Sequence, residues 1–234
     1  MNIRVRFRKY GVLKFIGHLD VMRYFQKAIR RADIDICYSE GYSPHMIMSF
    51  ASPLGLGLES DGEYMDIRIN GSISSKEAVH RLNAVMVEGI DVMSFRELPE
   101  NSKNAMASVA AADYEVRFRE GCAPEDDWKE QFTEFLAQSE MRIVKETKKG
   151  QQEIDIRPWI YSWEIVDDMI KMQVSAGSVH NLKPEMVLKA FAEHIGWDMP
   201  QFALLVTRRE MYADQGTEEE RKLISLEALG EEIG

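Results

Sequence analysis

The tetrapeptide Val-Arg-Phe-Arg occurs twice in this chain, at 5–8 and again at 116–119, an offset of 111 residues. Both copies alternate apolar and basic residues, which is typical of a strand with one buried and one exposed face. A chain of 234 residues is long enough for one large domain or two small ones. The repeat therefore favours two halves of the same architecture.

The segments after each copy follow a similar order. In the first half, apolar spacing predicts a helix over 18–32 and a second helix over 74–87, with Ser74 or Ser75 as N-cap. Strand patterns follow the helices, with a turn-rich stretch after the first helix. The predicted strands of this half cover 3–8, 46–51, 63–70 and 90–98. In the second half, helices are predicted at 126–137 and 183–194, a closing strand at 202–211, and a long insertion around 151–161.

Strand-helix-strand-strand-helix-strand is the split βαβ order. The predicted fold class is therefore α+β, with two tandem ferredoxin-like (βαββαβ) units, antiparallel sheets and internal duplication. We expect domains at 1–99 and 107–213, joined by a polar linker. The residues 214–234 are rich in acids and are expected to form a short helix or a frayed tail.

The first strand predicts a basic sheet face. Its apolar residues would point at the helices and its arginines at the opposite face, which Tyr64 and Asp66 would share. An open sheet with basic and aromatic side chains is a common RNA-binding surface of this fold. The alternatives are that the second half packs on this face or that Asp66 neutralises an arginine. The three arginines are Arg4, Arg6 and Arg8.

Charge is distributed unevenly along the chain. The net charge of −10 alone would argue against a nucleic-acid binder. However, residues 1–31 hold nine basic residues and one acid, a local charge of +8, whereas residues 100–234 carry −11. Phosphate or an acidic protein surface would bind the basic segment; alternatively, it is a solvated helix face that pairs with the acidic half.

Composition also bears on compartment and cofactors. Two cysteines, Cys37 and Cys122, do not make a disulfide framework, so we expect a reducing, cytoplasmic setting. Two thiols are also too few for an iron–sulfur cluster. We expect no metal site and no cofactor. We also expect no membrane span, because proline and glycine interrupt the uncharged window at 41–58.

Two histidines are candidates for chemistry. His18 begins the first predicted helix, where backbone donors favour anions, and His45 follows a turn region. The two could converge and act as an acid or base on a phosphate ligand. A lone histidine is more often structural, and no residue is assigned as catalytic.

Several motifs resemble those of a known family. They are Lys14-Phe15-Ile16-Gly17-His18-Leu19-Asp20, Tyr38-Ser39-Glu40-Gly41-Tyr42-Ser43-Pro44-His45, Pro53-Leu54-Gly55-Leu56-Gly57, Ile154-Asp155-Ile156-Arg157-Pro158 and Val206-Thr207-Arg208. The chain resembles the radical SAM-linked protein family, a domain of unknown function. Gly17 departs from it, since the family usually has serine there.

The resemblance implies a companion role beside a radical SAM protein with a cobalamin-binding-type domain, and a connection with RNA. We therefore expect a non-catalytic accessory protein that binds tRNA or rRNA. The alternatives are a metal-independent endoribonuclease that uses His18 or His45, and an adaptor that docks an acidic surface of the partner enzyme. The expected RNA contacts are Arg6, Arg8, Lys14, His18, Arg23, Lys27, Arg30, Arg31 and His45. The sequence does not indicate an oligomeric state.

Overall fold

The computed structural model describes residues 1–125, 127–147, 150–217 and 220–234. It is a mixed α+β protein whose strands pair mostly antiparallel. The chain forms two compact units. Unit 1 contains Met1–Ala111 and Arg208–Gly234, and unit 2 contains Ala112–Thr207.

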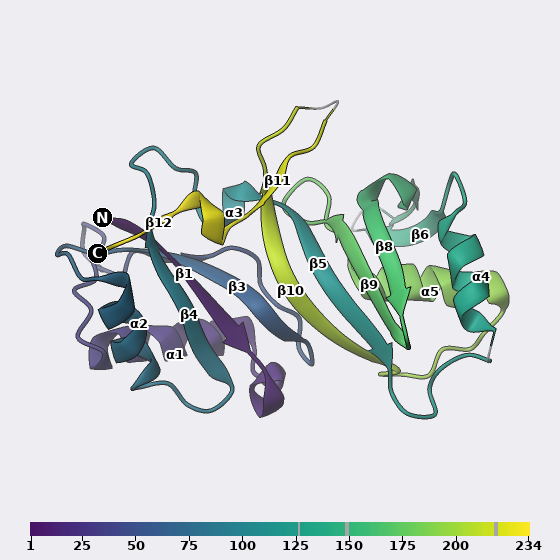
Figure 1. Ribbon diagram of the computed structural model, residues 1–234, viewed down its shortest axis with the longest axis horizontal. Coiled ribbons are helices and arrows are strands. Elements are labelled where there is room, and N and C mark those ends of the chain that lie inside the picture. Colours follow the sequence, from purple (N-terminus) through teal and green to yellow (C-terminus); the bar gives the residue numbers. More distant parts are fainter. Residues whose placement is uncertain (126, 148–149, 218–219) are drawn as a thin grey trace. The chain divides into compact units, whose positions relative to one another are not determined.

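Unit 1 has a sheet in the order β12-β4-β1-β3-β10, with β2 paired to β3 and β11 paired to β10 (Figure 1). Its strands are β1 (Asn2–Lys9), β2 (Met48–Phe50), β3 (Glu59–Arg68), β4 (Ile90–Glu97), β11 (Leu223–Ser225), β12 (Glu231–Glu232) and parts of β5 (Val109–Phe118) and β10 (Leu204–Asp214). Its helices are α1 (His18–Arg31), α2 (Ser75–Asn83), α3 (Ala105–Ser108) and the 3-10 helices η1 (Gly11–Phe15) and η3 (Glu227–Leu229).

The core of unit 1 lies between the sheet and the helices α1 and α2. Val5 of β1, Phe25 of α1 and Leu82 of α2 belong to one buried cluster, as the alternation and helical spacing predict. Phe7 packs against Phe25 with ring centroids 4.6 Å apart. The burial of these apolar faces fixes the other face of β1, and therefore its arginines, on the side of the sheet away from the helices.

Unit 2 has its strands in the order β10-β5-β9-β8, and β6 and β7 form a separate two-stranded sheet. The helices α4 and α5 contact each other through Phe132 and Phe191, whose ring centroids are 4.9 Å apart. The elements are α4 (Trp128–Leu136), β6 (Arg142–Thr147), β7 (Gly150–Asp155), η2 (Arg157–Trp159), β8 (Ile160–Val166), β9 (Met169–Ser175) and α5 (Pro184–Ile195).

The two units have the same strand order. Four strands of unit 1 lie in the order β4-β1-β3-β2, and four strands of unit 2 in the order β10-β5-β9-β8. Along the chain of unit 1, α1 lies between β1 and β2, and α2 between β3 and β4. Along the chain of unit 2, α4 lies between β5 and β8, and α5 between β9 and β10. The inserted β6–β7 hairpin begins earlier than the predicted insertion. Residue 126, the predicted start of a helix, lies outside the described residues.

The segments predicted as linker and tail are parts of unit 1. Ala105 and Leu226 are completely buried. The backbone N–H of Ala105 donates to Asp66 Oδ2 at 2.6 Å, and β12 pairs with β4. Between Leu223 and Glu232 the chain forms the short strands β11 and β12 and the 3-10 helix η3, and Leu226 is buried there, which a charge count does not reveal.

Candidate functional site

The helix α1 presents a basic face to solvent. Gly17 is its N-cap and, having no side chain, makes no side-chain capping bond. Lys27, Arg30 and Arg31 are exposed, and none of their side chains makes an ion pair or hydrogen bond within the described ranges. Arg23 is also exposed and, among the residues that the structure describes, pairs with Asp20 alone, at 3.4 Å. Four predicted contact residues therefore remain available to a ligand.

The arginine face of β1 is not open, contrary to the expectation from the sequence. Arg4 is 1% exposed and binds Asp66 through Nε at 2.8 Å and Nη2 at 3.0 Å. The carbonyl oxygens of Lys103 and Leu226 also accept from its guanidinium. The alternative that Asp66 neutralises an arginine is thus confirmed, and segments of unit 1 itself cover this face.

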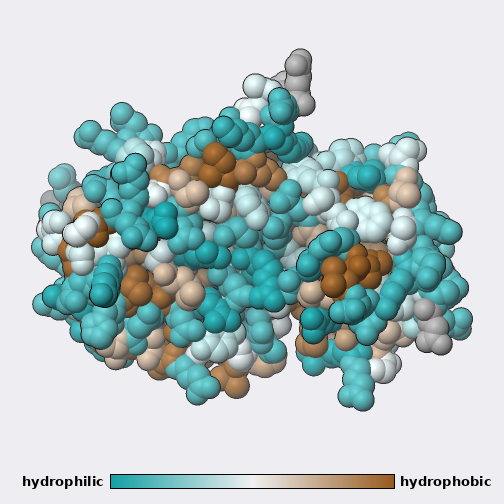
Figure 2. Space-filling model, viewed as in Figure 1, coloured by the Kyte–Doolittle hydropathy of each residue, from teal (hydrophilic) through white to brown (hydrophobic). Residues whose placement is uncertain are grey.

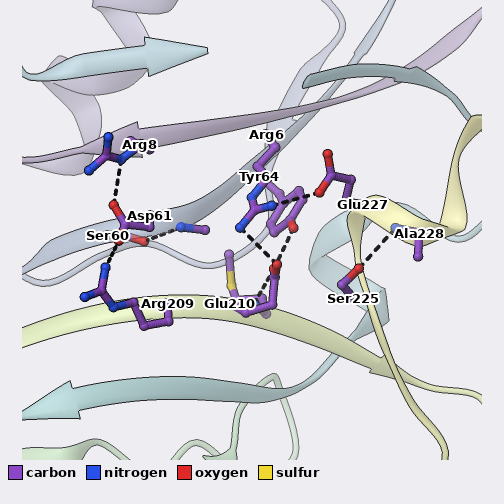
Figure 3. Close-up of polar contacts among 12 residues, drawn as sticks. Arg6, Arg8, Ser60, Asp61, Tyr64, Arg209, Glu210, Ser225, Glu227 and Ala228 are labelled. Atoms are coloured by element: carbon purple, nitrogen blue, oxygen red, sulfur yellow. Dashed lines mark hydrogen bonds and ion pairs between the residues drawn. The ribbon is translucent and has the colours of Figure 1, made fainter. Parts of the chain in front are cut away.

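Arg6 belongs to a half-buried network that includes residues from the late part of the chain (Figure 3). Its guanidinium pairs with Glu210 at 3.1 Å and with Glu227 at 2.8 Å. The Tyr64 hydroxyl donates to the same Glu210. Burial raises the pKa of Glu210 against the opposing effect of Tyr64 and Arg6. Burial alone would also raise the pKa of Glu227, but a hydrogen bond with Ser94 and the attraction of Arg6 outweigh it and lower that pKa. Arg6 is therefore a poor candidate for an RNA contact.

Arg8 and Lys14 are also paired within unit 1. Arg8 Nε lies 2.6 Å from Asp61 Oδ1, and Arg209 binds the other oxygen of that carboxylate (Figure 3). Lys14 Nζ lies 3.1 Å from Glu59 and above the ring of Phe15. The arginines of β1 and Lys14 thus each have a carboxylate partner, which neutralises most of the positive charge that the sequence predicted for this region.

The two candidate histidines have different surroundings. His18 is half-buried, its ring lies edge-on to Phe50 with centroids 5.2 Å apart, and it lines a small pocket. His45 is exposed, and its Nδ1 lies 2.8 Å from the hydroxyl of Ser39. His45 is not among the residues that line the pocket at His18, so that pocket does not bring the two together.

The pocket at His18 contains ionisable groups that the sequence analysis did not select. Lys9 and Glu63 line it, and Arg208 binds Glu63 behind it. All three are buried, with exposed fractions of 3%, 5% and 3%. Lys9 continues the alternation of β1 on the apolar face, so its position next to Phe7 was the sequence signal that could have identified it.

Apolar side chains are exposed beside the start of α1. Val12, Phe15 and Leu19 are exposed by 77%, 65% and 59%. Leu56 is 65% exposed in a loop that is fixed to this segment, because Gly57 N donates to Lys14 O at 2.9 Å. Surfaces with several exposed apolar side chains often contact partner molecules. On the face shown in Figure 2, hydrophilic residues predominate and several hydrophobic patches lie among them.

Within residues 1–125, 127–147, 150–217 and 220–234, no three histidine, cysteine or acidic side chains are grouped as a metal site. No helix in the same ranges is long and apolar enough to span a bilayer. Cys37 and Cys122 are unpaired thiols.

The fold and the exposed cations define a mixed α+β protein with a basic helix face and a small charged pocket. Comparison with known families assigns it more closely. Residues 2–184 match the family described as "Uncharacterized protein conserved in bacteria (DUF2344)", and the chain belongs to this family. Among curated proteins, a search found no match.

Proposed function

We propose that this protein binds RNA through the exposed face of α1 and acts as an accessory to a radical SAM enzyme. The observation that carries the RNA proposal is the set of exposed cations on one helix, of which Lys27, Arg30 and Arg31 have no side-chain partner within the described residues. Lysine and arginine side chains on one face attract phosphate groups, and each neutralised phosphate releases a counterion. A tRNA or an rRNA would fit this chemistry equally.

A salt titration tests the RNA proposal. Binding of a tRNA pool and of rRNA fragments to the full chain would be measured by filter binding at several salt concentrations. Arg30→Glu with Arg31→Glu should weaken binding strongly and reduce the slope of log K against log salt by about 1.4, since a single strand contributes about 0.7 per phosphate contact.

The matched control is Lys76→Glu with Arg81→Glu on α2, which changes the net charge by the same amount in the same unit. This control should keep most of the affinity, because the phosphate contacts are local. Equal losses in the two double variants, or wild-type affinity that does not depend on salt, would contradict the proposal.

The partner proposal is supported by the exposed apolar side chains Val12, Phe15, Leu19 and Leu56 beside the basic helix. A protein surface with apolar centres and acidic neighbours would complement this region. Co-purification of the radical SAM protein after nuclease treatment tests it. If the wild-type protein retains the partner and Phe15→Asp loses it, the result supports a docking role, and with it the adaptor alternative. If Phe15→Asp retains the partner as well as the wild type does, the result contradicts this role.

The endoribonuclease alternative is carried by His18, which lies beside the ionisable Lys9 and Glu63. In that mechanism the imidazole would remove the proton of a 2′-hydroxyl. Incubation with total RNA in the presence of a chelator would reveal cleavage, and His18→Gln should abolish it. Intact RNA with wild-type protein would eliminate the alternative.

We also infer that each unit is a ferredoxin-like (βαββαβ) half of a duplicated protein that works in the cytoplasm. The shared strand order of the two units supports the duplication. Separate expression of residues 112–207 tests whether that half is an independent unit, because a repeat with its own core should unfold cooperatively.

A further inference from the structure

The small pocket beside His18 has apolar walls and a charged floor. Phe7, Val21 and Phe50 form part of the wall, and Lys9 and Glu63 bring charge into it. The pocket volume is about 10 Å³, about the space that a single water needs. Only a small polar group can therefore enter, and any remaining part of a ligand must stay outside.

The charges around the pocket do not balance. Arg208 donates to Glu63 Oε1 from Nε at 2.9 Å and from Nη2 at 2.6 Å, and its Nη2 also donates to Ser52 O at 2.9 Å. Glu63 is thus neutralised by Arg208. The ammonium group of Lys9 remains as an excess positive charge in a buried position.

Lys9 is poorly satisfied by the protein. Its ammonium has three N–H donors, and in the described part of the chain they make a single hydrogen bond, 3.4 Å long, to Ile16 O. Burial lowers the pKa of Lys9, and repulsion from Arg208 adds to the effect of burial, while Glu63 opposes it. A buried cation without close partners is costly for a fold that needs only packing at this position.

The start of α1 adds to the positive potential of the pocket. His18 and Val21, both of the first turn, line it. The first N–H groups of a helix lack intrahelical acceptors and favour anions. The Gly17 side chain cannot accept from them. The buried Lys9 and two residues from the first turn of α1 thus line the same small pocket.

We propose that this pocket binds an oxyanion, the phosphate or carboxylate group of a small molecule, with Lys9 as its principal charge partner. One anionic oxygen enters the pocket and accepts from the Lys9 ammonium, and His18 lies at its side. The rest of the ligand lies outside, beside Leu54. This site is separate from the RNA surface proposed for α1, and it does not require RNA binding.

Isothermal titration and thermal melts at constant ionic strength test the proposal, with inorganic phosphate, acetate and chloride as probes. Wild-type protein should show saturable binding and a rise in Tm with phosphate or acetate, and no such rise with chloride. The stronger of the two anions identifies whether the pocket prefers a phosphate or a carboxylate group. Binding of neither probe would overturn the proposal.

Lys9→Met keeps the length of the side chain and removes the charge. Its affinity for the preferred anion should be at least about tenfold lower, as expected for the loss of one charged hydrogen bond. Without the anion it should melt at the same temperature as wild type or higher, because a buried charge is removed. Lys14→Met, which removes a nearby surface charge, should keep the wild-type affinity.

Phosphate also stabilises proteins by exclusion from their surface, and this contribution would persist unchanged in Lys9→Met. A Tm shift of equal size in both proteins would therefore overturn the site. If Lys9→Met does not fold, His18→Gln replaces it, with an expected loss of affinity of several-fold and unchanged affinity as the contrary result.

Discussion

The hydroxyl of Tyr64 donates a hydrogen bond of 2.5 Å to Oε1 of Glu210, a residue 146 positions later in the chain. The bond joins β3 to β10 within unit 1. Glu210 also pairs with Arg6 of β1. One carboxylate of β10 therefore binds both the Tyr64 hydroxyl and the Arg6 guanidinium. Burial raises the pKa of Tyr64, and the adjacent Glu210 raises it further. Tyr64 therefore remains a neutral donor.

Tyr64→Phe removes this donor and keeps the ring. We expect the free energy of unfolding to fall by about 1.5–3 kcal/mol, the usual contribution of a hydrogen bond to a charged group. Urea unfolding measures the change. Tyr42→Phe, at a fully exposed position, is the control and should have no measurable effect; a Tyr64→Phe protein as stable as wild type would contradict this interpretation.

Asp61 should make unit 1 sensitive to acid. Burial alone would raise the pKa of Asp61, but hydrogen bonds and attraction from Arg8 and Arg209 outweigh it and lower the pKa below its ordinary value of 3.8. A carboxyl with a lowered folded pKa contributes stability above its unfolded pKa and loses it as the pH falls through the folded pKa.

Asp61→Asn should therefore be less stable at neutral pH, by about 1 kcal/mol for a partly exposed network, and its stability should change less with pH below about 4. Chemical unfolding at a series of pH values checks this, and the wild-type minus variant difference isolates Asp61. If the difference in free energy of unfolding between wild type and variant stays constant down to pH about 2, protonation of Asp61 has no effect, and its ion pairs do not stabilise the protein.

Gly62 lies where β3 approaches β10 closely. A Cβ atom at this position would lie 2.6 Å from the carbonyl oxygen of Arg209 and 2.8 Å from Glu210 Cα. Because these are backbone atoms, Gly62→Ala must separate the strands, and we expect a loss of about 1–3 kcal/mol. Gly71→Ala, with open space around it, should change stability by less than about 0.5 kcal/mol. Equal stabilities of the two variants would refute the close approach.

Leu226 tests whether the C-terminal segment packs against the rest of unit 1. Its side chain is fully buried, so Leu226→Ala should cost about 2–5 kcal/mol through lost burial and a cavity. Thermal or urea unfolding gives the value. Leu56→Ala at an exposed position serves as the control, and a loss for Leu226→Ala no larger than that of the control would indicate that this segment does not pack as described.

Periodicity predicted much of the local structure. The first helix was expected to begin at His18 and does, and Ser74 caps α2 by accepting from Glu77 N, as proposed. Alternation also predicted correctly that Tyr64 and Asp66 share a sheet face with the β1 arginines, since Arg6 is the register partner of Tyr64 and Arg4 that of Asp66. These features depend on neighbours in sequence or on adjacent strands of a simple topology.

The state of the basic face was not predictable in the same way. Arg6 is neutralised by Glu210 and Glu227, which lie more than 200 positions away, the first in the predicted closing strand and the second in the predicted acidic tail. The pocket was missed for a related reason. Arg208 and Lys9 come from opposite ends of the chain, and only the packing of β10 against β3 brings Arg208 to Glu63. The RNA contacts on α1 stay a prediction.

The pairing of Arg6 with Glu227 has a consequence for biosynthesis. The two residues are 221 positions apart, and all of unit 2 is translated between them. During synthesis, β1 emerges early with arginines whose partners do not yet exist, while unit 2 is a continuous segment that can fold at once. Arg4 and Arg8 gain their partners Asp66 and Asp61 as soon as β3 has been made. Arg6 must wait for Glu210 and Glu227, and until then its guanidinium is available to a polyanion.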